Sequence, residues 1–279
     1  MYYQVFRWFP KSGFTRLMGW LAEKQWPPFL LRGFIRVYIR LFRVDMEACP
    51  LPLESFSTFN GFFSRPIRPE LRMIDASRNT VVSPVDGRVS QAGVISYSEL
   101  VQAKGHTYTV KALLAGDESW TNFEGGSYIT IYLSPRDYHR IHSPVKGRVT
   151  RFYYVPGQLW TVSPAGVKGV PGLFARNERI ITFVETDFGE VAVVKVGATV
   201  VGKVKVAYSP VETRIKGGRP FAQDLKRAYP VEKGQELGRF EMGSTVICLF
   251  PPGKVFLNPM APDQALVMGQ TIGVLGDNQ

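Results

Sequence analysis

The chain has 279 residues, of which 45% are hydrophobic and 20% are charged, and its formal net charge is +11 at pH 7. This composition excludes an intrinsically disordered protein, and the length suits one large domain or two small ones. Two cysteines and three histidines provide neither a disulfide framework nor the ligand spacing of a structural zinc site, so we expect a reducing compartment and no metal.

The first 45 residues combine positive charge with aromatic side chains. They hold eight Lys or Arg, two acidic residues and twelve of the 36 aromatic residues. Positive charge alone is also typical of nucleic-acid binding, but together with Trp, Tyr and Phe it favours a membrane surface. We therefore expect an anionic membrane surface, and no nucleic acid, as a partner of this segment.

Residues 29–43 predict an amphipathic helix. At roughly 100° per residue, four arginines fall within an arc of about 80°; they are Arg32, Arg36, Arg40 and Arg43. The opposite face is apolar and consists of Leu31, Phe34, Ile35, Tyr38, Leu41 and Phe42. Two prolines at 27 and 28 separate this helix from a second candidate at residues 15–25.

We assign residues 1–48 as amphipathic helices that lie on a membrane. No run of about 18 uncharged apolar residues could span a bilayer, and no secretory cleavage site follows an apolar region. Two alternatives remain for this segment, namely helices packed against the protein's own core and an Arg-rich targeting peptide.

Residues 49–279 predict a β-rich catalytic domain. After a short helical stretch at residues 57–63, β-branched runs alternate with Gly and Pro, and the clearest runs are 128–133, 180–185, 191–196, 199–206, 245–250 and 271–275. The gaps are mostly too short for crossover helices, so the strands should be largely antiparallel. The fold class we expect is mainly β (α+β), with a β-sandwich or distorted barrel as its core.

One seven-residue segment is repeated in the β-rich part. Residues 83–89 match residues 143–149 at six of seven positions, and the single difference is Asp86 against Lys146. Both copies read as a turn that leads into a strand. Either both are ordinary surface turns, or one copy has been recruited for its carboxylate.

Three kinds of residue could carry chemistry. Gly243 and Ser244 stand directly before an apolar run, and His139 and His142 lie three residues apart far upstream. A hydroxyl that follows glycine can attack the preceding carbonyl when an imidazole removes its proton. Alternatively, the serine is a plain strand residue and the histidines make structural hydrogen bonds.

Several segments together resemble the phosphatidylserine decarboxylases of the bacterial membrane-associated type, over almost the whole chain. The matching segments are FFSR at 62–65, SPVDG at 83–87, SPRDYHRIH at 134–142, LFARNER at 173–179, VGATVVG at 196–202 and GRFEMGST at 238–245. The family usually has Leu where this chain has Met242, which is a volume-conserving change.

The resemblance implies a self-cleaving proenzyme. Asp86, His142 and Ser244 would form a protease-like triad in which the Ser244 hydroxyl attacks the Gly243 carbonyl. Cleavage would give residues 1–243 and a chain of residues 244–279 that begins with a pyruvoyl group derived from Ser244. That group, without metal or pyridoxal phosphate, would form a Schiff base with phosphatidylserine and release CO2 and phosphatidylethanolamine. His139 would be the proton donor in decarboxylation.

The resemblance also implies partners and a location. The two cleaved chains would stay together, two such protomers would form a homodimer, and the enzyme would sit peripherally on the cytoplasmic face of the bacterial inner membrane, in phospholipid biosynthesis. Two other functions remain open from the residues alone. They are an intact serine hydrolase, although the chain lacks the Gly-x-Ser-x-Gly motif, and a non-enzymatic, membrane-tethered β module.

Overall fold

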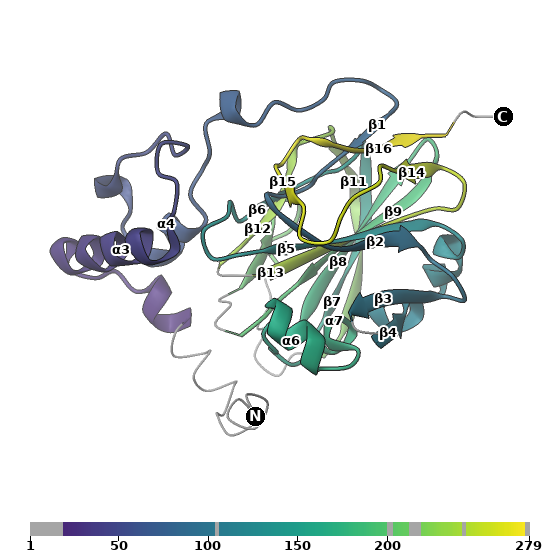
Figure 1. Cartoon of the computed structure of the whole chain (residues 1–279), viewed down its shortest axis with the longest axis horizontal. Coiled ribbons are helices and arrows are strands. Elements are labelled where there is room, and N and C mark those ends of the chain that lie inside the picture. Colours follow the sequence, from purple (N-terminus) through teal and green to yellow (C-terminus); the bar gives the residue numbers. More distant parts are fainter. Residues whose placement is uncertain (1–18, 104–105, 200–202, 212–218, 242–243, 277–279) are drawn as a thin grey trace.

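The computed structural model describes residues 19–103, 106–199, 203–211, 219–241 and 244–276 (Figure 1). Its helices are α3 (Pro28–Phe42), α4 (Phe59–Phe63), α5 (Val110–Leu113), α6 (Pro164–Gly169) and α7 (Leu173–Arg176), with 3₁₀ turns η1 (Leu53–Ser55), η2 (Pro69–Leu71) and η3 (Glu118–Phe123). Its strands are β1 (Thr80–Val82), β2 (Gly87–Val94), β3 (Glu99–Ala103), β4 (His106–Thr109), β5 (Ser127–Leu133), β6 (Arg140–His142), β7 (Gly147–Val155), β8 (Arg179–Thr186), β9 (Gly189–Val196), β10 (Val204–Val206), β11 (Phe221–Val231), β12 (Glu236–Phe240), β13 (Ser244–Phe250), β14 (Val255–Leu257), β15 (Ala265–Leu266) and β16 (Thr271–Leu275).

An eight-stranded sheet dominates the molecule, in the order β11-β7-β8-β9-β13-β5-β2-β15. Two three-stranded sheets, β1-β16-β14 and β10-β12-β6, and the hairpin β3-β4 accompany it. Every pairing between these strands is antiparallel. The expected mainly β, antiparallel fold is therefore confirmed.

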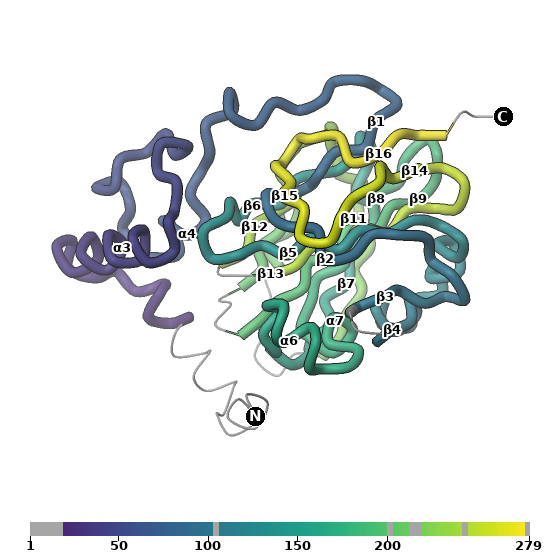
Figure 2. The backbone as a smooth tube through the Cα atoms, in the orientation of Figure 1, coloured from purple at the N-terminus to yellow at the C-terminus, as the bar shows by residue number. Residues whose placement is uncertain are grey.

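Each face of the large sheet buries its own apolar core. Because side chains alternate along a strand, Val246 and Cys248 of β13 face the two small sheets, whereas Ile247 and Leu249 face the short helices α5, α6 and α7. The C-terminal strands β14, β15 and β16 lie against β1 and β2 at one end of the large sheet (Figure 2). Residues 244–276 are thus part of the common core, as the sequence predicts.

The two repeated turns lie side by side. The His142 N–H donates to the Pro84 carbonyl at 2.8 Å, and the Val82 N–H donates to the Pro144 carbonyl at 3.1 Å. The proline carbonyl of each copy thus accepts the backbone N–H of the residue just before the other copy, and the two copies form one structural unit.

A second repeat, which we did not recognise in the sequence, completes this arrangement. A Gly-Gln pair at residues 234–235 precedes β12, and another at residues 269–270 precedes β16. The Gly234 N–H donates to the Ser143 carbonyl at 2.8 Å, and the Gly269 N–H donates to the Ser83 carbonyl at 3.0 Å. Both glycines have positive φ, 79° and 88°, which a side chain would disfavour.

A helical module lies beside the β body (Figure 1). The expected helix at 29–43 is α3, and the short stretch at 57–63 contains α4, whose N-terminus is capped by the Thr58 hydroxyl. Their apolar residues form one cluster that includes Leu31, Ile35 and Phe62. This cluster contains residues from both sides of position 48. The packing therefore does not mark the expected domain boundary at residue 48, which stays a prediction. Of the candidate helix at 15–25, residues 19–23 are helical, residues 24–25 are not, and residues 15–18 lie outside the described part of the chain.

The apolar face of α3 divides into two parts. Leu31 and Ile35 point into the cluster and are buried. A second stripe, Leu30, Phe34, Val37 and Leu41, is exposed to solvent. Packing and an exposed apolar surface, which the sequence presents as alternatives, therefore occur on one helix. Among the residues that the structure describes, no helix is long and apolar enough to cross a bilayer.

Candidate functional site

Position 244 opens the central strand of the large sheet. The Ser244 backbone lies opposite Leu133 of β5, and Thr245 lies between Tyr132 of β5 and Val196 of β9. The side chain of Ser244 and the whole of Gly243 lie outside the described part of the chain. The backbone geometry thus places the expected cleavage point at the start of a strand that is paired on both sides.

The segment before this point is held by three contacts, two to the segment around β10 and one to α4. The buried carboxylate of Glu241 pairs with Lys205 at 2.7 Å and accepts a hydrogen bond from the Asn60 amide of α4 at 3.3 Å. The Glu241 N–H donates to the Lys203 carbonyl at 2.8 Å. Asn60 and Glu241 are functional candidates that we missed in the sequence, although both lie in or beside the family segments.

His139 lies beside the same segment. Its carbonyl accepts the Phe240 N–H at 2.9 Å, and its ring centroid is 4.0 Å from that of Phe63. The ring is fully buried, and Nδ1 donates to the Asp137 carbonyl at 2.8 Å. Burial lowers the pKa of His139 to about 3. The imidazole is therefore neutral, and its Nε2 lone pair has no hydrogen-bond partner among the described residues.

His142 ends β6, opposite Glu236 of β12. Its Nδ1 donates to the Gly234 carbonyl at 2.7 Å, so its Nε2 accepts the Tyr138 hydroxyl at 3.0 Å. Burial is the main cause that lowers the pKa of His142 below 6.5. The structure therefore holds a neutral imidazole with a fixed tautomer.

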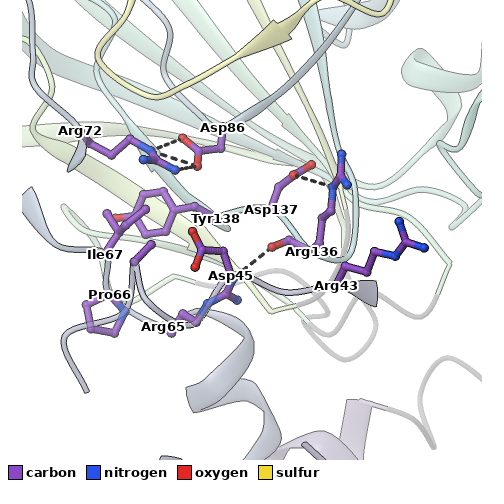
Figure 3. Close-up of a pocket in the computed structure, with 11 residues that line it drawn as sticks. Arg43, Asp45, Arg65, Pro66, Ile67, Arg72, Asp86, Arg136, Asp137 and Tyr138 are labelled. Atoms are coloured by element: carbon purple, nitrogen blue, oxygen red, sulfur yellow. Dashed lines mark hydrogen bonds and ion pairs between the residues drawn. The ribbon is translucent and has the colours of Figure 1, made fainter. Parts of the chain in front are cut away.

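Asp86 is engaged by other groups. Arg72 donates to its two carboxylate oxygens at 2.9, 3.1 and 2.5 Å (Figure 3), and the Met268 N–H donates to Oδ1 at 2.8 Å. The structure brings Asp86 and His142 into adjacent, backbone-bonded turns, but it gives no hydrogen bond between their side chains. In this arrangement the Gly234 carbonyl, rather than Asp86, orients the His142 ring.

The register of β12 separates the two histidines. Glu236 lies opposite His142, whereas Phe240 bonds to His139. Because the two histidines are three residues apart, their backbones are separated by roughly 10 Å at most. Of the two imidazoles, His139 is therefore the one that lies beside the segment leading to position 244.

Within the described residues, no group of three or more His, Cys, Asp or Glu could hold a metal ion. The arrangement consists instead of two buried neutral imidazoles, a carboxylate paired with Arg72, and a strand that begins with serine. Imidazole and carboxylate groups of this kind can accept and donate protons.

The chain matches the family model described as phosphatidylserine decarboxylase over residues 59–274. It is 46% identical over 276 residues to a phosphatidylserine decarboxylase proenzyme of Anaeromyxobacter sp. (strain K), and the match covers 98% of each chain. The proenzyme of Myxococcus xanthus (strain DK1622) is 46% identical, with 95% of each chain covered. That of Escherichia coli (strain 55989 / EAEC) is 45% identical, with 89% of this chain and 79% of the relative covered.

The burial of the two histidines predicts how they titrate. In NMR spectra of the full chain, the His139 ring should remain neutral until the pH falls to about 3, and His142 should protonate only below 6.5. Variants His139→Gln and His142→Gln assign the signals. Protonation of His139 near pH 6.5 would show that this ring is solvated, contrary to the described packing.

Proposed function

The chain belongs to the phosphatidylserine decarboxylase family, and from this premise we propose that it cuts itself between Gly243 and Ser244 and then decarboxylates phosphatidylserine through a pyruvoyl group. It is a carboxy-lyase made as a proenzyme. The observation that carries this assignment is the 46% identity to a proenzyme over 98% of both chains. Neither an intact serine hydrolase nor a non-enzymatic β module accounts for that match.

Self-cleavage begins when the Ser244 hydroxyl attacks the Gly243 carbonyl. The Gly243–Ser244 amide becomes an ester, and β-elimination then breaks the ester and leaves dehydroalanine at position 244. Hydrolysis of dehydroalanine gives the pyruvoyl group and releases ammonia. Gly243 suits the first step because it adds no side chain beside the attacked carbonyl.

We assign His142 as the base of this step and Asp86 as the group that stabilises its charged form. Two features support the assignment. His142 is neutral and can accept a proton, and Asp86, after Glu236, is one of the acidic groups whose charge opposes the lowering of the His142 pKa by burial. Both Nε2 and the Asp86 carboxylate have other partners, Tyr138 and Arg72. The triad therefore forms only when Tyr138 leaves Nε2, the Gly234 carbonyl leaves Nδ1 and Arg72 releases Asp86.

The residues around position 244 fit a covalently attached pyruvoyl group. Backbone pairing with β5 fixes the residue that would carry the group, and the unpartnered Nε2 of His139 leaves an acceptor beside the preceding segment. A pyruvoyl ketone supplies the electron sink for loss of CO2. His139 Nε2 can accept the proton that the substrate ammonium must lose, and it can later return a proton to the substrate carbon.

The exposed stripe of α3 supports binding at a membrane surface. Leu30, Phe34, Val37 and Leu41 would enter the interface, while the arginines of the same helix attract anionic lipid such as phosphatidylserine. We place the enzyme on the cytoplasmic face of the inner membrane as a peripheral protein. Its other partners would be its own cleaved chain and a second cleaved protomer.

Replacing Ser244 should abolish cleavage. Ser244→Ala should fold and run as one chain on denaturing gels, because the attacking hydroxyl is gone. The matched control is Thr245→Val, which removes a neighbouring buried hydroxyl that has no hydrogen-bond partner in the described structure. That control should still yield two chains. Cleavage of Ser244→Ala would exclude Ser244 as the nucleophile.

The two histidines should fail at different steps. His142→Ala should remain one chain, whereas His139→Ala should cleave and then lose decarboxylation by about 10²-fold or more, since general acid–base catalysis contributes that much. Gel analysis and CO2 release measure the two steps separately. A block of cleavage in His139→Ala would reverse the assignment and agree with its position beside Phe240.

The stripe on α3 should govern binding to vesicles. Val37→Glu should weaken flotation with vesicles containing phosphatidylserine by about tenfold, because it places a charge where apolar surface is buried. Val94→Glu is the matched control, since Val37 and Val94 are 63% and 65% exposed and only the first lies on α3. Equal losses in both variants would mean that α3 is not the binding surface.

A further inference from the structure

A cavity of about 250 Å³ lies between the segments that flank the helical module and the β body (Figure 3). Positive charge is concentrated in it, on Arg43, Arg65, Arg72 and Arg136. Three carboxylates also line it, on Asp45, Asp86 and Asp137.

Two of the arginines already have carboxylate partners. Arg72 is bound to Asp86 at 2.5 Å, and Arg136 lies 3.8 Å from Asp137. Asp45, the third carboxylate, accepts the Glu47 N–H at 2.9 Å. Of the other two arginines, Arg43 is exposed to solvent, whereas Arg65 is buried, and its charge needs an explanation.

Arg65 is a buried cation without an ion pair in the described structure. Its residue is only 6% exposed, Nη2 donates to the Arg136 carbonyl at 3.0 Å, and the guanidinium lies 5.5 Å from the Phe62 ring centroid. Nη1 is buried and has no acceptor among the described residues. A buried guanidinium with an unused donor is costly unless an anion binds it. This donor therefore points to an anionic ligand.

We propose that Arg65 and this cavity bind the phosphodiester of the phospholipid substrate, an inference that rests on the proposed function. A guanidinium matches phosphate oxygens with paired N–H donors. The substrate carboxylate is the less suitable ligand, because its charge leaves as CO2. A cation held against it would stabilise the ground state more than the transition state.

The position of the cavity agrees with this ligand. On one side Tyr138 lines it, and Tyr138 precedes His139 and bonds to His142. On the other side Arg43 lines it, directly after α3, which exposes the apolar stripe. A phosphate at Arg65 would thus lie between the catalytic histidines and the helix that meets the acyl chains. In phosphatidylserine, only a few covalent bonds separate the phosphate from the substrate's own serine carbon that loses CO2.

Arg65→Ala tests the proposal with a short-chain phosphatidylserine kept below its micelle concentration. Substrate and transition state share the phosphodiester, so KM should rise about 10- to 100-fold while kcat stays within about twofold. Arg68→Ala is the matched control, because Arg68 lies in the same segment but is exposed and does not line the cavity. Arg68→Ala should keep the KM of the unaltered enzyme.

An unchanged KM in Arg65→Ala, or a fall in kcat alone, would overturn the proposal. Two chains on a denaturing gel confirm that the variant has folded and cleaved, and Arg65→Lys replaces it if it has not. Retention of the original KM in Arg65→Lys would then show that a point charge suffices and that the paired donors are not used.

Calorimetry on the cleaved enzyme measures ligand binding without catalysis, so it distinguishes a failure of this proposal from a failure of the proposed function. Glycerophosphoethanolamine should bind, and binding should weaken in the Arg65 variant even if the enzyme releases no CO2. Inorganic phosphate is the comparison. Equal or tighter binding of inorganic phosphate would identify a general phosphate site and contradict assignment to a lipid headgroup.

Discussion

The structure depends on the central strand β13, which begins at position 244 and is paired on both sides. Its hydrogen bonds to β5 and β9 and its two buried faces tie the residues after the cleavage point into both cores. Breaking the bond before position 244 therefore removes one covalent link but none of the described strand pairs. This explains how a chain can cut itself and keep its fold, with the new terminus held in place.

Around β13, burial determines the protonation state of the two histidines. Desolvation keeps His139 and His142 neutral, and the hydrogen bonds of each Nδ1 to a carbonyl direct the Nε2 lone pairs. The paired turns bring Asp86 and His142 next to each other through backbone bonds. Arg72 holds Asp86 in the described state, so the proposed role of this carboxylate beside His142 requires a change of partners. Arg65, which follows α4 of the helical module, lines the cavity from the side facing away from the β body.

Much of the fold could be predicted, because alternating β-branched runs and the 3.6-residue pattern of α3 are local signals. The division of the α3 apolar face could not, since a pattern of apolar residues does not say which of them meet a neighbour. Two other features also depend on tertiary contacts that the sequence does not reveal. One is the Arg72–Asp86 ion pair, and the other is the buried Lys195 side chain of β9, which bonds to the Thr182 hydroxyl of β8. The Gly-Gln repeat was present in the sequence, but too short to recognise without the paired turns. Asp86, His139, His142 and Ser244 were candidates from the residues alone, but their roles came from a family resemblance and stay predictions.

The mass of the short chain from the purified protein tests the central claim most directly. If Ser244 becomes a pyruvoyl group, the fragment should weigh one ammonia less than unmodified residues 244–279 with serine still at the new terminus, and it should react with hydroxylamine. A fragment with the full mass of residues 244–279 would mean simple hydrolysis. An uncut chain of 279 residues would contradict self-processing altogether.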